Sequence, residues 1–178
     1  MIQNVDRARS YIKDIVETLP QPYKSLCESV TLCKEFWTSP ASKPESGKHH
    51  NYPGGLAVHT AQVLEGALDF SESIPCSHTF LVVAAIWHDA GKMKDYSETG
   101  VTTHYTMIKH LSSSYAMFYK EATAYGLINE EIEMIGHMIL AHHGRHEWGS
   151  PVEPKTPEAW ILHAADMLSA HYLGKESQ

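Results

Sequence analysis

The sequence predicts an all-α fold in a single domain, and three observations support this prediction. Apolar residues recur at helical spacing in several segments that loop-forming residues separate. One of these segments, residues 80–87, is apolar on every side and is therefore expected to run through the middle of a core. The length of 178 residues suits one domain, and 43% hydrophobic residues are enough for one substantial core.

Net charge limits the kind of partner. The formal net charge of −7 argues against a broad basic surface that grips long nucleic acid through its phosphates. It does not exclude a local basic pocket. We therefore expect a small or short partner, such as a nucleotide or a short single-stranded nucleic acid, and we leave homo-oligomer formation open.

Cysteines and apolar runs indicate the compartment. Cys27, Cys33 and Cys76 are an odd number without a Cys-x-x-Cys pair, which favours neither a disulfide framework nor a thiolate zinc site. The longest apolar run is shorter than the ~20 residues of a membrane span, and the N-terminus has no signal-peptide layout. We expect a soluble, cytoplasmic protein without membrane contact.

The first 47 residues predict helices that pack on the core. Apolar residues at helical spacing predict one helix over residues 5–19, ended by prolines, and a second over residues 26–37. Residues 39–47 have the composition of a loop. The two helices are too short to bury a core of their own, so residues 1–47 are expected to cover the domain of residues 48–173.

A turn at Pro53-Gly54-Gly55 introduces the next helix. Its apolar face is formed by Leu56, His59, Val63, Ala67 and Phe70. His59 is thus expected to point into the core, where, taken alone, a hydrogen-bonded core histidine is the better interpretation. His49 and His50 lie before the helix in a polar loop, where surface histidines and substrate contacts are equally good interpretations.

The apolar helix of residues 80–87 ends in His88-Asp89. Burying a bare imidazole and a bare carboxylate would cost several kcal/mol each, so both need partners inside the protein. A metal ion is a partner that suits both side chains.

Two further helices also place histidines inward. A helix from about Thr106 is predicted to carry Met107, His110, Ser114 and Met117 on one face, after a turn-like polar segment at residues 94–100. The next helix opens at Asn129, a cap-type residue, and ends at His143-Gly144. Its apolar face is formed by Ile132, Ile135, Ile139 and His142.

The polar loop of residues 145–154 follows directly, and loops beside a site commonly shape it for substrate. Trp148 is equally well interpreted as a substrate contact or as a hydrophobic plug, and Arg145 as a phosphate clamp or as a solvated charge. Thr156-Pro157 begins the last helix, which places Asp166 in a mostly apolar run. Residues 174–178 are expected to be a frayed tail.

Considered together, these inward polar residues predict a metal centre. The candidate ligands are His59, His88, Asp89, His110, His142, His143 and Asp166. Imidazoles and carboxylates without thiolates suit Mn, Fe, Co, Ni or Zn better than Ca, and we favour Mn or Fe. Seven ligands exceed the four of one zinc, so we expect two divalent ions with Asp89 as the bridge, ~3.5–4 Å apart.

A metal pair of this kind suits hydrolysis of a phosphoester, because it polarises a phosphoryl oxygen and lowers the pKa of bound water. Asp89 and Lys92 are the candidate catalytic residues. Lys92 follows His88 by one helical turn, where it can balance charge on phosphate oxygens. A surface lysine would be the better interpretation without the neighbouring His-Asp pair.

These motifs resemble the HD-domain metal-dependent phosphohydrolase superfamily over about residues 48–170. The sequence is most similar to the HD domain of YhaM-like 3′-to-5′ exoribonucleases. The motifs that carry this resemblance are His49-His50 through Gly54-Gly55-Leu56, His59-Thr60, His88-Asp-Ala-Gly-Lys92 and His142-His-Gly-Arg-His-Glu-Trp-Gly-Ser-Pro151. The resemblance implies an all-helical fold, a divalent metal pair and phosphodiester cleavage that releases nucleoside monophosphates.

By position, the resemblance implies two ligand groups that share Asp89. One group is His59, His88, Asp89 and Asp166, and the other is Asp89, His110, His142 and His143. Lys92 would neutralise the phosphate, and the candidate substrate contacts are His49, His50, Lys92, Arg145 and Trp148. The exoribonucleases that this sequence resembles have two parts, one of which is an N-terminal OB-type module for single strands. Here two helices are predicted at the N-terminus instead. This difference favours short oligonucleotides or free nucleotides as substrates.

Three alternative functions stay open. A nucleotidase or nucleoside triphosphohydrolase would use the same ligands. A di-iron oxygenase on a similar helical scaffold would need no phosphate-binding lysine, and a non-catalytic nucleotide-binding module would need no complete ligand set.

Overall fold

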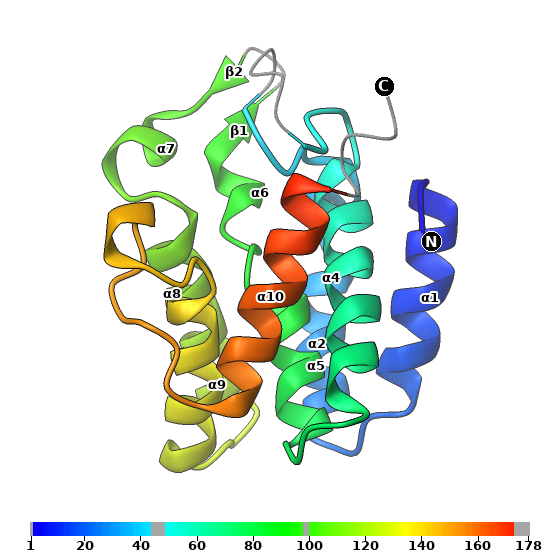
Figure 1. Ribbon diagram of the computed structural model, residues 1–178. Coiled ribbons are helices and arrows are strands. Elements are labelled where there is room, and N and C mark those ends of the chain that lie inside the picture. Colours follow the sequence, from blue (N-terminus) through cyan, green and yellow to red (C-terminus); the bar gives the residue numbers. More distant parts are fainter. Residues whose placement is uncertain (1, 44–48, 98–99, 173–178) are drawn as a thin grey trace.

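The computed structural model describes residues 2–43, 49–97 and 100–172, and it is almost entirely helical in these ranges (Figure 1). The first half of the chain contains α1 (Val5–Glu17), α2 (Tyr23–Thr31), α3 (Lys34–Thr38), α4 (Gly55–Ser71) and α5 (His78–Trp87). The second half contains α6 (Lys92–Asp95), β1 (Tyr96–Ser97), β2 (Gly100–Val101), α7 (Thr103–Met107), α8 (His110–Ala124), α9 (Asn129–Ala141), the 3₁₀ helix η1 (His146–Trp148) and α10 (Pro157–His171). The predicted all-α fold is confirmed.

Helix α5 occupies the centre of the bundle, as its uniformly apolar sequence predicts. Every residue from 81 to 87 is buried, and α5 contacts α2, α4, α8, α9 and α10. Ser77 begins the helix, because its side chain accepts a hydrogen bond from the backbone N–H of Phe80 at 3.3 Å. The end of α5 is therefore surrounded by other helices.

The N-terminal helices pack on this core. Ala8 and Ile12 of α1 and Leu26 of α2 are fully buried in the same apolar cluster as α4 and α5. The second predicted helix is divided into α2 and α3, and Leu32 at the break is 83% exposed. Phe70 is 39% exposed, so its predicted place on the buried face of α4 is wrong.

The region between α5 and α8 differs from the prediction. Residues 94–95 belong to α6, and β1 pairs with β2 in a short antiparallel hairpin instead of a turn-like segment. The helix predicted from Thr106 is two helices, α7 and α8, because the backbone turns sharply at Lys109, where φ is 64°. Met107 consequently does not share the inward face of His110 and is 77% exposed.

Helix starts agree in part with the sequence. Thr156 caps α10 as predicted, because its hydroxyl accepts a hydrogen bond from Ala159 N at 3.2 Å. The residue that precedes α9 is Ile128, not the predicted Asn129, and Glu131 accepts a hydrogen bond from the N–H of Ile128 at 3.2 Å. The predicted tail of residues 174–178 and part of the predicted 39–47 loop lie outside the described residues.

Within residues 2–43, 49–97 and 100–172, every helix is too short or too polar to span a bilayer.

Candidate metal centre

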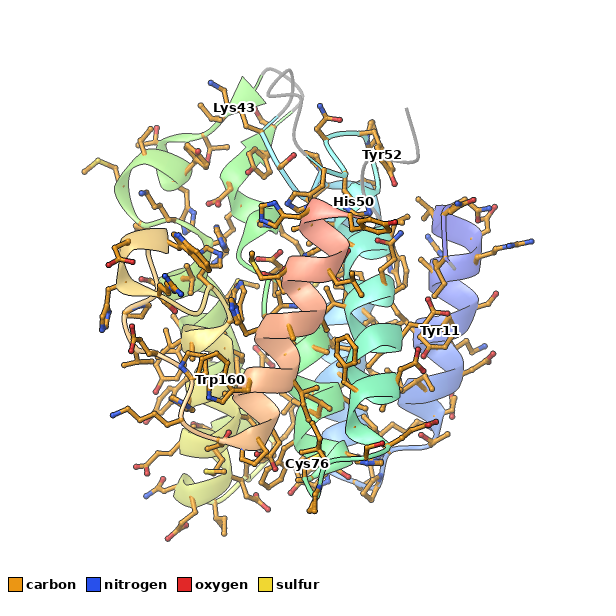
Figure 2. All side chains as sticks on the ribbon, in the orientation of Figure 1. Tyr11, Lys43, His50, Tyr52, Cys76 and Trp160 are labelled. Atoms are coloured by element: carbon orange, nitrogen blue, oxygen red, sulfur yellow. The ribbon has the colours of Figure 1, made fainter. Side chains whose placement is uncertain are left out.

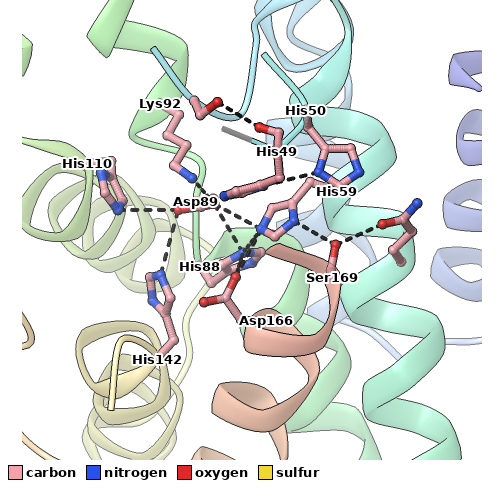
Figure 3. Close-up of polar contacts among 12 residues, drawn as sticks. His49, His50, His59, His88, Asp89, Lys92, His110, His142, Asp166 and Ser169 are labelled. Carbon is pink, nitrogen blue, oxygen red and sulfur yellow. Dashed lines mark hydrogen bonds and ion pairs between the residues drawn. The ribbon is translucent and has the colours of Figure 1, made fainter. Parts of the chain in front are cut away.

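All seven predicted ligands come together between the helices, and Figure 3 labels all of them except His143. They are contributed by α4, the end of α5, the start of α8, the end of α9 and α10. We describe them as two ligand sets that share Asp89. The first ligand set is His59, His88, Asp166 and Asp89 Oδ2, and the second ligand set is His110, His142, His143 and Asp89 Oδ1.

The first ligand set is deeply buried. The Nε2 atom of His59 lies 3.3 Å from Nε2 of His88 and 3.1 Å from Asp166 Oδ1. Both imidazoles are fully buried, and Asp166 is 9% exposed. Three segments that are far apart in the sequence therefore meet at one point.

The second ligand set lies closer to the surface. Nε2 of His110 is 3.2 Å from Nε2 of His143. His142 is 1% exposed, whereas His110 and His143 are only partly buried. His142 and His143 follow one another at the end of α9, so one helix terminus supplies two imidazoles.

Asp89 lies between the two sets with a different oxygen toward each. Its Oδ2 atom is 3.3 Å from Nε2 of both His59 and His88. Its Oδ1 atom is 3.5 Å from His110 Nε2 and 3.7 Å from His142 Nε2. The residue is 1% exposed, and neither oxygen accepts a hydrogen bond of good geometry from another described residue.

Two of the histidines are oriented by the ends of their own helices. A helix C-terminus leaves backbone carbonyls without intrahelical partners. The Nδ1–H of His88 donates to the carbonyl of Ala85 at 2.7 Å, and the Nδ1–H of His142 donates to the carbonyl of Ile139 at 2.7 Å. In both cases the Nε2 atom is directed into the ligand sets.

His59 is oriented by a longer chain of hydrogen bonds. Ser169 Oγ donates to Gln62 Oε1 at 2.9 Å and therefore accepts from His59 Nδ1, also at 2.9 Å. The Gln62 amide in turn donates to the carbonyl of Ile2 at 2.7 Å. His143 Nδ1 donates to the carbonyl of Trp148 at 3.0 Å.

These hydrogen bonds place the imidazole protons on Nδ1 and leave Nε2 as a lone pair. In their neutral forms, His59 and His88 therefore direct Nε2 lone pairs toward each other, and neutral His143 directs its Nε2 lone pair toward Nε2 of His110. Facing lone pairs beside a buried carboxylate are unfavourable unless a cation lies between them. The donor set thus fits divalent metal ions.

The pKa shifts of Asp89 and His142 favour the protonation states that metal binding requires. Burial raises the pKa of Asp89, but Lys92 and His88 outweigh burial and hold this pKa well below its usual range. Burial and the neighbouring imidazoles of His143 and His88 keep the pKa of His142 well below its usual value. The carboxylate is therefore charged and this imidazole is neutral at neutral pH, as ligands must be.

His59 differs from the other histidines. Burial lowers its pKa, but hydrogen bonds and charge attraction from Asp166 and Asp89 outweigh burial and raise it. A cation that binds the first ligand set has to displace the proton that these carboxylates favour.

Lys92 and Asp89 open onto a pocket. The Lys92 ammonium lies 2.6 Å from Asp89 Oδ2, and the residue is 7% exposed. The pocket has a volume of about 480 Å³, and its lining residues are His49, Asp89, Lys92, His142, His143, Trp148, Asp166, Met167, Ala170 and His171. Ligand groups and a buried lysine are thus reachable from one side.

The predicted substrate contacts lie at different places around this pocket. His49 lines it, and its ring centroid is 5.1 Å from that of His59. His50 lies behind His49, is 2% exposed and is seen at the end of the bundle where α4 begins and α10 ends (Figure 2). Trp148 lines the pocket and is 47% exposed, whereas Arg145 lies outside the lining with its guanidinium 5.1 Å from the Trp148 ring centroid.

Sequence reasoning missed several residues around the site. Ser169 lies three residues after Asp166 on α10, a helical spacing that indicates a shared face. Met167, Ala170 and His171 line the pocket from the same helix. Asp95, buried near His110, follows Asp89 and Lys92 at intervals of three residues, which is a signal that the sequence contains.

Comparisons with known proteins agree with this architecture. A family model described as the HD domain matches residues 56–171. The 3′-5′ exoribonuclease YhaM of Bacillus pumilus is 33% identical over 182 residues, which cover 89% of this chain and 58% of that protein. The protein of the same name from Bacillus subtilis is 32% identical with the same coverage.

A third relative extends the comparison to another genus. The 3′-5′ exoribonuclease YhaM of Halalkalibacterium halodurans is 36% identical over 126 residues, which cover 68% of this chain and 39% of that protein. The chain thus spans 58% of the length of the first two relatives. No solved structure matches the chain significantly.

Proposed function

The chain belongs to the HD domain family, and on that premise we propose that it is a metal-dependent phosphohydrolase that cleaves nucleotide phosphoesters. More specifically, we propose a 3′-to-5′ phosphodiesterase that acts on short single-stranded nucleic acid. The relatives that are named 3′-5′ exoribonucleases support this choice of reaction.

One observation carries the proposal. Two pairs of facing Nε2 atoms lie on opposite sides of one buried carboxylate, with Asp89 Oδ2 toward the first ligand set and Asp89 Oδ1 toward the second. A single carboxylate with one oxygen toward each set is the arrangement expected of a bridge between two cations. We propose Mn or Fe as the divalent ions, with Co, Ni and Zn as alternatives that the same ligands accept.

When bound, a metal pair supplies Lewis acidity toward a phosphoryl oxygen and a water of lowered pKa. The protein contributes the rest. Lys92 is a buried cation at the pocket wall, where its ammonium would neutralise charge that develops on the phosphate oxygens. Asp89 would hold both ions in place, and His49 would donate or accept a hydrogen bond at the same wall.

Other lining residues of the pocket suit a nucleoside. Met167 and Ala170 provide apolar surface, and Trp148 provides an aromatic ring at the rim. Aromatic rings bind nucleobases with little dependence on sequence, which agrees with an exonuclease acting on successive nucleotides. Arg145 would support the Trp148 ring through its cation–π contact, and His50 would support His49 from behind.

The pocket volume favours a second candidate function. About 480 Å³ lies in the range of pockets for small ligands, so a free nucleotide would also be accommodated. The same ligands and Lys92 would then act as a nucleotidase or nucleoside triphosphohydrolase.

A product time course tests the proposal. Protein dialysed with Mn²⁺ would be incubated with a short 3′-hydroxyl RNA, its DNA counterpart and nucleoside triphosphates, with Asp89→Ala as the blank. Asp69→Asn is a matched control, because Asp69 is exposed on α4 and lines a different groove. We expect stepwise release of monophosphates from the oligomer. Turnover of triphosphates alone would replace the exonuclease assignment, and no turnover of any of these would overturn the phosphohydrolase.

A further inference from the structure

His110 stands in a different local environment from the other imidazoles of the two ligand sets. It is the first residue of α8, whereas His88 and His142 lie at helix C-termini. A helix N-terminus exposes backbone N–H groups, not carbonyls. The Nδ1–H of His110 therefore has no nearby carbonyl in its own helix to orient it and needs an acceptor from another segment.

Asp95 lies where this acceptor is needed. Its Oδ2 atom is 3.5 Å from His110 Nδ1, and its Oδ1 atom is 2.9 Å from His104 Nδ1. Asp95 is fully buried, and its Oδ2 atom has no other partner among the described residues. The carboxylate is thus shared between two imidazoles, one of which belongs to the second ligand set.

The backbone around this contact is closely constrained. A Cβ atom on Gly91 would lie 2.4 Å from the carbonyl oxygen of His110, so this glycine permits α6 to approach the start of α8. Lys109, directly before His110, has a φ of 64°, which is uncommon for a residue with a side chain. The carbonyl of Asp95 accepts a hydrogen bond from Thr102 N at 3.0 Å, which ties the end of α6 to the residues before α7.

We propose that Asp95 is a positioning residue for His110. It holds the Nδ1 proton and the ring direction so that Nε2 faces the second ligand set, and His104 holds the carboxylate in this orientation. Carboxylates behind metal-binding histidines act in this way in other proteins and raise the affinity for the metal. The inference rests on the proposed metal-dependent function, but it makes a separate statement about the ring of His110.

The test combines metal binding with the tautomer of His110. Asp95→Asn keeps the size of the side chain and removes its charge. Glu158→Gln is the matched control, because Glu158 is also buried and accepts a hydrogen bond, from Ser77 N at 2.8 Å, in the first turn of α10. His104→Ala is the second variant, which leaves Asp95 in place if Asp95→Asn does not fold.

Metal content and ¹⁵N NMR of the metal-free protein give independent readouts. We expect Asp95→Asn to bind the second Mn²⁺ roughly 10- to 100-fold more weakly while it retains the first, and His104→Ala to show a smaller decrease in the same direction. In the metal-free protein, His110 should change from the tautomer protonated at Nδ1 to a mixture, and Glu158→Gln should change neither property.

The outcomes separate the two proposals. Unchanged affinity for both ions together with an unchanged His110 tautomer in Asp95→Asn would overturn the positioning role. A wild-type protein that binds no Mn²⁺ would overturn the proposed function, and the NMR comparison would still decide whether Asp95 orients His110.

Discussion

The two ligand sets are built from different parts of the fold. His59 projects from the middle of α4 and His88 from the end of α5, two helices of the core, and both rings are fully buried. The second set takes His110 and His143 from helix ends, where Asp95 and the carbonyl of Trp148 orient them. Packing of the core thus defines the first set, whereas short segments outside the long helices orient two of the three imidazoles of the second.

This difference has a thermodynamic consequence. Buried helices open only when much of the protein unfolds, whereas short connections open locally at lower free energy. We therefore expect the first ligand set to be preorganised and to bind its cation more tightly. The second set should exchange its cation more readily.

We expect the largest effect from the substitution of Asp89, the residue that the two sets share. Asp89→Ala should lose both ions and lower the rate by roughly 10⁴-fold or more, because catalytic residues that act as a unit fail together. Metal content and the oligonucleotide time course measure this effect, with Asp69→Asn as the control. Two ions retained in Asp89→Ala would contradict the bridge.

A second pair of variants separates the sets. His110→Ala should lose one ion and roughly 10²-fold in rate while the other ion stays bound, because the first set keeps all its ligands. His59→Ala should lose the other ion and should also lower stability, because His59 is fully buried and hydrogen bonded to Ser169. Loss of the same ion in both variants would show that the sets are not independent.

Lys92 distinguishes metal binding from phosphate binding. Lys92→Ala should keep both ions and lower kcat by roughly 10²-fold, because it removes a charge beside the phosphate and no ligand. Metal analysis and steady-state kinetics measure the two properties. Lys120→Ala is the control, because the Lys120 side chain is 82% exposed. Loss of a bound ion in Lys92→Ala would contradict a role that is limited to phosphate binding.

Chelator titration sharpens the expected difference in affinity. The ion of the second ligand set should leave at a lower chelator concentration, and its loss should change Tm little. Removal of the ion of the first ligand set should lower Tm by roughly 5–10 °C, because a tightly bound ligand stabilises the folded protein by several kcal/mol. Calorimetry at stepwise chelator concentrations measures both. A single step with simultaneous loss of both ions would remove the distinction.

The smallest expected effect is the pH dependence of the metal-free protein. The folded-state pKa values of His142 and His143 lie below the usual 6.5, so below that pH the unfolded chain takes up protons that the folded chain does not, and stability falls. The contribution of His59 has the opposite sign, because its pKa is raised, and is lost as pH rises through that pKa.

More of these histidines have a lowered pKa than a raised one. Burial also lowers the pKa of His50 to about 3. Tm of the metal-free protein should therefore fall by ~2 °C or more between pH 7.5 and pH 5.5, and the fall should be smaller in His142→Gln. A Tm that rises over this range would reverse the expected balance.

Most of the candidate ligands were accessible from the sequence because they are polar at positions that periodicity makes apolar. His59 and Asp166 illustrate this, since each lies in a helix whose neighbouring residues form the core. The uniformly apolar residues 81–87 likewise predicted the central helix. Local periodicity is sufficient for such features because they repeat within one helix.

Other features depend on contacts between distant segments. The division between α7 and α8 arises at Lys109, whose positive φ occurs where Gly91 lies close to the start of α8. Apolar spacing continues through this break, so periodicity predicted one helix and an inward Met107. The role suggested for Asp95 likewise depends on a hairpin that brings His104 back to it.

The hydrogen bonds behind His59 reach beyond the region that the family model covers. They run through Ser169 and Gln62 to the carbonyl of Ile2, whereas the family match begins at residue 56. A protein trimmed to the matched region would keep every ligand and still lack the last acceptor of this chain. In protein engineering, the unit to transplant or to minimise should therefore include the segment before α1 as well as the helices that bear the ligands.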